Sequence, residues 1–113
     1  MTGAKSQQET WRRALDEFVE RLRALYGERL KGVMLYGSRA RGDWEEESDI
    51  DTLIVLRTLP DFWEARHQIS PVASEISLKH DLVITAIPTS ETDLQESGSP
   101  LFLNIRREGV VVG

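Results

Sequence analysis

YGSRARGDWEEESDIDTLIVL, residues Tyr36–Leu56, contains the two features that decide the fold and the chemistry of this 113-residue chain. The first is Gly37-Ser38, which directly follows a short apolar run, Val33–Tyr36, typical of a buried strand. Glycine permits a tight turn and close approach of a phosphate to the backbone, and the serine hydroxyl can donate to a phosphate oxygen. Taken alone, the pair predicts only a turn; a phosphate site needs a second feature.

The second feature is a pair of aspartates, Asp49 and Asp51, at the opening of an apolar run rich in β-branched residues, Ile50–Leu56. Residues two apart on a strand project from the same face, about 7 Å apart at their Cα atoms. Like charges so placed repel, and a divalent cation such as Mg²⁺ between them would relieve the repulsion. The alternative is that Asp49 caps a turn after Ser48 while Asp51 is solvated at a sheet edge.

The sequence outward from this segment predicts one α/β domain, residues 1–113, with a single sheet. A capping box at Ser6 and Glu9 starts a helix that ends at Gly27. The segment from Pro60 to Lys79 is helical, with a kink or a fresh start at Ser70-Pro71. The last predicted elements are a strand, a loop, a helix capped by Ser99 and a short strand: Leu82–Ile87, 88–98, Leu101–Glu108 and Val110–Val112.

Composition narrows the class of function. Acidic residues outnumber basic ones by 19 to 14, a net charge of −5, which argues against direct binding to a nucleic-acid backbone. The absence of cysteine excludes disulfides and thiolate-ligated zinc. The polar start from Met1 to Glu9 does not resemble a signal peptide, and no apolar run approaches the roughly 20 residues of a membrane span. We therefore expect a cytoplasmic protein without a membrane partner.

Together, Gly37-Ser38, ten intervening residues and Asp49-x-Asp51 resemble the signature of the DNA polymerase β-like nucleotidyltransferase superfamily. Ala40-Arg41-Gly42 and the closing N-I-R-R-E-G, Asn104–Gly109, sharpen the likeness to its minimal nucleotidyltransferases. The resemblance implies an α/β (α+β) fold with one small mixed sheet flanked by helices. It also implies metal-dependent transfer of AMP from ATP to an acceptor hydroxyl.

The same resemblance assigns roles to individual residues. Gly37 and Ser38 would hold the triphosphate, while Asp49 and Asp51 would bind two Mg²⁺ ions, for which Mn²⁺ could substitute. The family has a third carboxylate on a neighbouring strand, and the candidate is Asp81, whose alternative interpretation is an ordinary turn aspartate. Arg39 and Arg41 would add positive charge near the phosphates, or are solvated surface arginines. His67 and His80 are interpreted as surface residues.

The chain has no obvious platform for a large acceptor. Within the family, domains of this size pair with a helical HEPN-type toxin, and the nucleotidyltransferase is the antitoxin of a type VII system that adenylylates a tyrosine of its partner. Two alternatives remain: an enzyme for a small hydroxylated acceptor such as an aminoglycoside, or an antitoxin that neutralises by binding alone. An enzyme for a small acceptor would form a homo-oligomer. An antitoxin would form a hetero-oligomer with its toxin partner. Trp44, in the acidic segment before the aspartates, has no role assigned by its sequence context.

Overall fold

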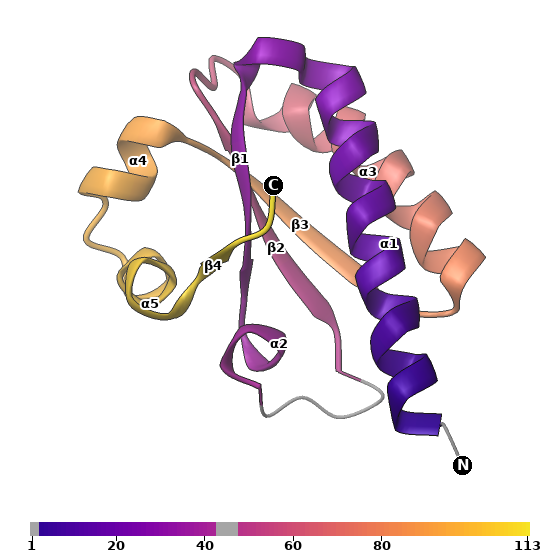
Figure 1. The fold of residues 1–113 in the computed structure, drawn as a ribbon. Helices are drawn as coiled ribbons and strands as arrows, with labels where there is room; N and C mark the ends of the chain where they lie inside the picture. Colours follow the sequence, from indigo (N-terminus) through magenta and orange to yellow (C-terminus); the bar gives the residue numbers. More distant parts are fainter. Residues whose placement is uncertain (1–2, 43–47) are drawn as a thin grey trace.

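A single four-stranded sheet organises the chain, with the strands in the order β3-β2-β1-β4 (Figure 1). The structure, a computed structural model, describes residues 3–42 and 48–113, with side chains from Thr10 onward. The elements are α1 (Gly3–Tyr26), the 3-10 turn η1 (Gly27–Arg29), β1 (Leu30–Tyr36), α2 (Ser38–Arg41), β2 (Ile50–Leu56), α3 (Phe62–His80), β3 (Ile84–Ser90), α4 (Glu91–Glu96), α5 (Pro100–Glu108) and β4 (Val110–Val111).

The sheet is mixed. β1 pairs antiparallel with both β2 and β4, whereas β2 and β3 run parallel, connected by the crossover helix α3. The helices α1 and α3 cover one face of the sheet, and α4 and α5 lie against the other (Figure 1). This is the predicted α/β (α+β) architecture with one small mixed sheet flanked by helices.

β2 is one of the two inner strands and is buried on both faces. Ile50, Ile54 and Leu56 belong to the core under α1 and α3. Leu53 and Val55 belong to the smaller core that includes Ile105 of α5. Burial of each large apolar side chain contributes roughly 1.5–3 kcal/mol, so β2 is firmly anchored. By the same alternation, Asp51 projects from the face that α4 and α5 cover.

Several predicted boundaries were wrong, each for a reason visible in the packing. α1 begins at Gly3, so Ser6 lies inside the helix and is not its N-cap. α3 continues through Pro71 without a break. A proline inside a helix costs about 3 kcal/mol, and the burial of Ile69 and Ala73 on either side of it offsets this cost.

The third strand starts two residues later than predicted, at Ile84, and includes Pro88. Proline is tolerated there because β3 is an edge strand. The predicted loop contains the helix α4, whose N-cap Ser90 accepts a hydrogen bond from the Asp93 amide at 3.0 Å. The cap of α5 is confirmed, because the Ser99 hydroxyl accepts from the Phe102 amide. None of the helices in residues 3–42 and 48–113 is both long and apolar enough to cross a membrane.

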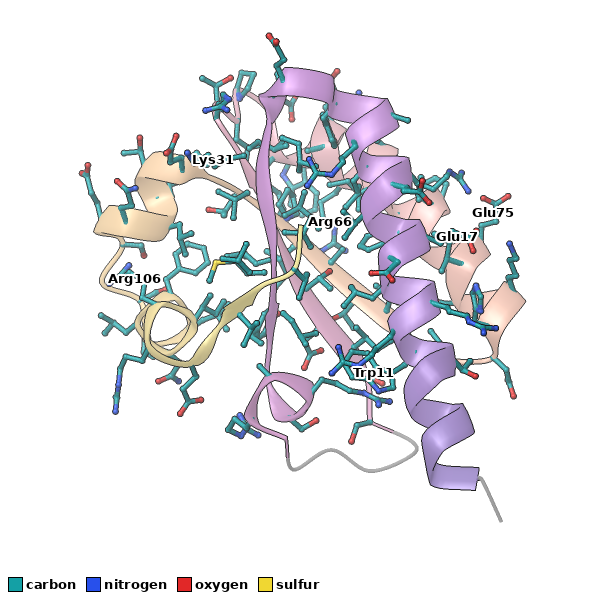
Figure 2. The ribbon with its side chains drawn as sticks, viewed as in Figure 1. Trp11, Glu17, Lys31, Arg66, Glu75 and Arg106 are labelled. Carbon is teal, nitrogen blue, oxygen red and sulfur yellow. The ribbon has the colours of Figure 1, made fainter. Side chains whose placement is uncertain are left out.

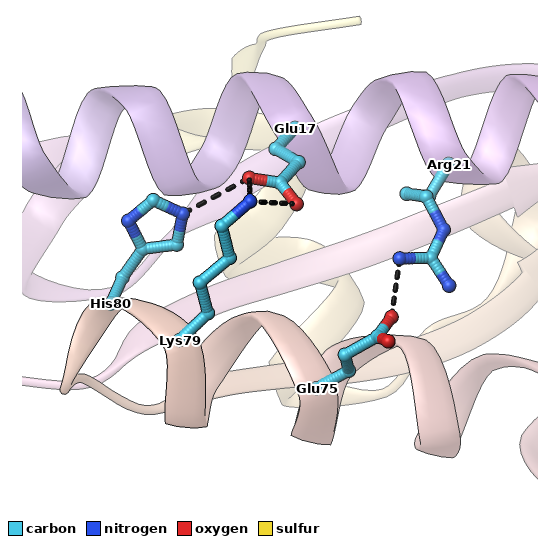
Figure 3. Close-up of polar contacts among 5 residues, drawn as sticks. All are labelled: Glu17, Arg21, Glu75, Lys79 and His80. Atoms are coloured by element: carbon cyan, nitrogen blue, oxygen red, sulfur yellow. Dashed lines mark hydrogen bonds and ion pairs between the residues drawn. The ribbon is translucent and has the colours of Figure 1, made fainter.

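Charged side chains join α1 to α3 (Figure 3). Glu17 contacts the Lys79 ammonium at 3.1 Å and the His80 ring Nε2 at 3.0 Å, and Arg21 contacts Glu75 one turn along. The hydrogen bond from His80 and, next, that from Lys79 hold the pKa of Glu17 below its ordinary value of 4.5. The contacts thus favour the charged form of Glu17 in the folded state.

This arrangement predicts a pH-dependent stability. A carboxyl group whose pKa is lowered on folding stabilises the folded state above its unfolded pKa and loses this effect as the pH falls through the folded value. Glu17→Gln should therefore lower the thermal unfolding midpoint at neutral pH, and its difference from wild type should disappear well below pH 4.5. Glu20→Gln, at an exposed position of the same helix, is the control. A difference for Glu17→Gln that persists unchanged in acid would contradict the assignment.

Candidate active site

Antiparallel pairing brings the two sequence features together at one end of the sheet. β1 ends at Tyr36, just before the Gly37-Ser38 turn, and the register pairs Tyr36 with Asp51 near the start of β2. The short helix α2 begins at Ser38 and lies at this end of β1 (Figure 1). The glycine-serine turn and the aspartate pair, eleven positions apart from Ser38 to Asp49 in the sequence, thus face one region of space.

The Asp51 carboxylate is fixed from two sides. Its Oδ1 accepts a hydrogen bond of 2.8 Å from the hydroxyl of Thr85, which is paired with Asp51 across the β2–β3 register. Its Oδ2 lies against Gly37, where a Cβ atom would come within 2.5 Å. The side chain is half-buried. These contacts hold the carboxylate in one orientation beside the turn.

Gly37 has two reasons to be glycine. Its φ of 75° and ψ of −154° lie in a region that only glycine readily adopts. In addition, any side chain would displace the Asp51 carboxylate. The sequence predicted the turn and the need for close approach; the neighbour that approaches within the structure is Asp51.

Tyr36, which is paired with Asp51 across β1 and β2, is partly buried. Its pKa is raised above 10.0, first by desolvation and second by the negative charge of Asp51. The phenol therefore remains neutral at physiological pH and packs against the core that includes Leu53 and Ile105. Tyr36 gives the site an apolar wall on the side of α5.

α2 is a single turn that follows Gly37 directly. The Gly42 amide donates to the Ser38 carbonyl at 3.0 Å and closes the turn, with Gly42 in the left-handed region. Ser38 is half-buried. The exposed Arg41 lies 3.8 Å from Glu108, an ion pair that connects α2 to α5. Ser38 and Arg41 therefore both lie on the turn that follows β1, and their contact with a nucleotide stays a prediction.

Arg39 is not a solvated surface arginine. Its guanidinium is buried, donates to the Ser48 carbonyl at 2.9 Å and lies 5.0 Å from the ring centroid of Trp11 on α1. Trp11 lies at the end of the sheet near α2 (Figure 2). Desolvation lowers the Arg39 pKa. These interactions direct the side chain into the protein, where it connects α2 with α1 and with the residue before Asp49, and its contact with phosphates stays a prediction.

The three predicted carboxylates are not grouped together in the structure. Asp49 is exposed and directly precedes β2, two positions before Asp51. Asp81 is the exposed C-cap of α3, in the left-handed conformation, with φ of 55°. Within residues 3–42 and 48–113, no three acidic or histidine side chains are grouped as metal ligands. The position on the neighbouring strand that is paired with Asp51 is Thr85, and the role of Asp81 as third carboxylate stays a prediction.

The remaining sequence predictions have simple outcomes. His67 is exposed, as expected, with a ring nitrogen 3.0 Å from the Trp63 carbonyl. His80, expected at the surface, is half-buried in contact with Glu17. Trp44 lies outside the described residues. Thr85 was missed, although the alternation Ile84-Thr85-Ala86 would have placed its hydroxyl on the Asp51 face once the strand pairing was known.

Comparison with known proteins identifies the family. The sequence profile of the nucleotidyltransferase domain matches residues 15–100, well over half of the chain. The chain belongs to the nucleotidyltransferase domain family. It is therefore a nucleotidyltransferase, of the polymerase β-like type that the spacing of Gly37-Ser38 and Asp49-x-Asp51 predicted.

Two similar proteins come from Methanocaldococcus jannaschii, and both are named as protein adenylyltransferases by inference. One is 42% identical over 79 residues, which are 70% of this chain and 73% of the relative. The other is 38% identical over 78 residues, which are 69% of this chain and 78% of the relative. These likenesses extend over more than two thirds of each protein.

Solved structures share the fold at low sequence identity. A protein of Sulfolobus solfataricus, assigned to the nucleotidyltransferases, superposes with a TM-score of 0.69 at 21% identity, covering 98% of this chain and 86% of its own. A toxin-antitoxin complex with AMP-PNP contains a chain that superposes with a TM-score of 0.56 at 18% identity, covering 83% and 68%. A tyrosine-to-alanine mutant of the MntA-HpeT toxin-antitoxin pair contains a chain that superposes with a TM-score of 0.57 at 19% identity. The match covers 84% of this chain and 68% of that one.

Proposed function

We propose that this nucleotidyltransferase is a protein adenylyltransferase that uses Mg²⁺ to transfer AMP from ATP to a tyrosine hydroxyl of a HEPN-type toxin, and so acts as an antitoxin. The proposal depends on one observation: the Asp51 carboxylate is held directly beside the Gly37-Ser38 turn. A metal-binding carboxylate and a phosphate-binding turn in contact are what transfer from a triphosphate requires.

The similar proteins support the choice of a protein acceptor. The two M. jannaschii relatives bear protein adenylyltransferase names. Among the structures that share the fold, one toxin-antitoxin complex holds AMP-PNP, and another is a mutant in which two aspartates two positions apart are replaced by glutamate. The net charge of −5 suits a basic, RNA-cleaving partner, because opposite charges speed encounter.

The residues present fit a divalent cation. Asp51 lies in β2 and Asp49 directly precedes this strand, two positions away in the sequence, and Oδ2 of Asp51 lies beside Gly37, where a Cβ atom would come within 2.5 Å of it. Mg²⁺ in such enzymes is bound by one or two carboxylates together with substrate phosphates and water, so a third protein carboxylate is not required. When bound, the ion would neutralise phosphate charge.

The chain's own residues would divide the remaining work. Gly37 allows the triphosphate to approach the turn, and the Ser38 hydroxyl donates to a phosphate oxygen. Arg41 can exchange its ion pair with Glu108 for one with a phosphate. The acceptor oxygen bonds to the α-phosphorus as pyrophosphate leaves, and the hydroxyl proton departs at the exposed side, where Asp49 lies. Holding the two reactants together supplies much of the rate advantage.

The test is intact-mass analysis of a candidate HEPN-type helical partner, incubated with the purified chain, ATP and Mg²⁺. We expect a mass gain of one or more AMP units with the wild type and none with Asp51→Asn. An unmodified partner whose toxicity is still neutralised would replace the enzymatic proposal with binding alone. AMP transfer to an aminoglycoside, with the partner unmodified, would favour a small-molecule acceptor.

A further inference from the structure

Thr85 lies at the position of β3 that is paired with Asp51. The registers β1–β2 and β2–β3 place Tyr36, Asp51 and Thr85 in one row across three neighbouring strands. All three side chains are on the sheet face covered by α4 and α5. The row thus brings a neutral hydroxyl to the place on the neighbouring strand where the resemblance implies a third carboxylate.

The hydrogen bonds of Thr85 fix its role as a donor. An ionised carboxylate only accepts, so in the 2.8 Å contact the Thr85 hydroxyl donates to Oδ1 of Asp51. The Thr85 carbonyl accepts from the hydroxyl of Thr52, a fully buried residue of β2, at 2.7 Å. The bond from Thr52 contacts only the backbone of Thr85, whereas the Thr85 side chain contacts the Asp51 carboxylate.

The two neighbours of Asp51 act on different oxygens. Thr85 engages Oδ1, and Oδ2 lies on the side of Gly37, next to the turn where we place the triphosphate. Without the hydroxyl, rotation about the Asp51 side chain could exchange the two oxygens or move both. With it, one oxygen is always presented to the turn.

We propose that Thr85 is a positioning residue that orients the Asp51 carboxylate for the divalent cation. This inference rests on the proposed function, because it assigns Asp51 the role of metal ligand. It distinguishes this chain from an enzyme with three carboxylates: two carboxylates bind the cation, and a hydroxyl on the third strand holds one of them in place. Such supporting hydrogen bonds typically affect metal affinity by about 10- to 100-fold.

The experiment measures binding of Mn²⁺ by electron paramagnetic resonance in the presence of a non-hydrolysable ATP analogue, so that no reaction is needed for the readout. Thr85→Val, which keeps the branched shape and removes the donor, should weaken Mn²⁺ binding by about 10-fold or more. Thr85→Ser, which keeps the donor, should stay close to wild type. In AMP transfer, Thr85→Val should raise the Mg²⁺ concentration for half-maximal rate while the KM for ATP at saturating Mg²⁺ changes little.

Thr52→Val is the matched control, because it removes the hydroxyl hydrogen bond from Thr52 to the Thr85 carbonyl, and the Thr52 side chain projects from the opposite face of β2 to that of Asp51. It should bind Mn²⁺ like the wild type. An equal loss in Thr52→Val and Thr85→Val would assign the effect to strand pairing and overturn the proposal. So would a loss in Thr85→Ser as large as that in Thr85→Val.

Failure of the inference and of the proposed function give different results. If the wild type binds Mn²⁺ and transfers AMP but Thr85→Val does both equally well, only the positioning role is overturned. If the wild type neither binds Mn²⁺ with the analogue nor transfers AMP, both are overturned. Circular dichroism confirms folding of each variant, and Thr85→Ala takes the place of Thr85→Val if the latter does not fold, with the same expected loss.

Discussion

Asp51→Asn should reduce AMP transfer by at least about 1,000-fold, a loss of about 4 kcal/mol in transition-state stabilisation, with little change in stability. In the proposed mechanism, the substitution removes the charge that binds the cation. An amide oxygen can still accept from Thr85, and repulsion from Asp49 is relieved, so the free energy of unfolding should stay within about 1 kcal/mol of wild type. Single-turnover transfer rates at saturating Mg²⁺ and urea denaturation provide the two measurements.

The matched control is Asp81→Asn. Asp81 is an exposed aspartate in the left-handed conformation, which asparagine also adopts. Because the structure separates it from the site, Asp81→Asn should transfer AMP at close to the wild-type rate. A wild-type rate in Asp51→Asn would remove the metal role of Asp51. A collapse of activity in Asp81→Asn would instead assign it as the third carboxylate and refute the two-carboxylate site.

Gly37→Ala should damage both the site and the fold. The new Cβ would meet Oδ2 of Asp51 at 2.5 Å and force the carboxylate out of position. The backbone conformation at φ of 75° and ψ of −154° is also strained for alanine, which costs about 1–3 kcal/mol. We expect transfer to fall by about 100-fold or more, as for other displacements of a reacting geometry by about 1 Å, in protein that is still folded at low temperature.

Gly42→Ala separates strain from contact. Gly42 also has a positive φ, of 84°, but no atom of the described residues, 3–42 and 48–113, lies within 4 Å of the position of its Cβ atom. Its left-handed conformation costs an alanine about 1–2 kcal/mol and leaves Asp51 untouched. We therefore expect Gly42→Ala to lose stability but to keep its rate per folded molecule. Equal activity losses in the two variants would show that turn strain, and not the contact with Asp51, accounts for the effect.

The elements that the sequence predicts best are those whose local pattern and tertiary role agree. The run of β-branched residues Ile50–Leu56 has the predicted bounds because β2 is buried on both faces. Leu82 and Val83 are apolar like a strand, yet β3 starts after them, since the left-handed Asp81 and the bond from the Ile84 amide to the Ser77 hydroxyl determine where pairing begins. Such tertiary contacts have no local signature.

The site shows the same division. Gly37 and the aspartate pair could be placed near each other from the sequence because the two strands that flank them pair as near neighbours. Thr85 comes from a strand 34 positions away from Asp51, and its partner depends on a register that one residue of slip would reverse. Arg39 could not be assigned from its neighbours, because whether it faces the nucleotide or Trp11 depends on its rotamer.

The inner position of β2 has a consequence for how the enzyme can adapt. In β2, the residues on either side of Asp51, Ile50 and Thr52, are fully buried. The Asp51 amide should therefore exchange its hydrogen with solvent only when the whole domain opens. Heat or denaturant should therefore abolish the aspartate site and the fold in one cooperative transition. Adjustment to different acceptors must come from elements outside this rigid strand, since the backbone of Asp51 cannot move without the core around it.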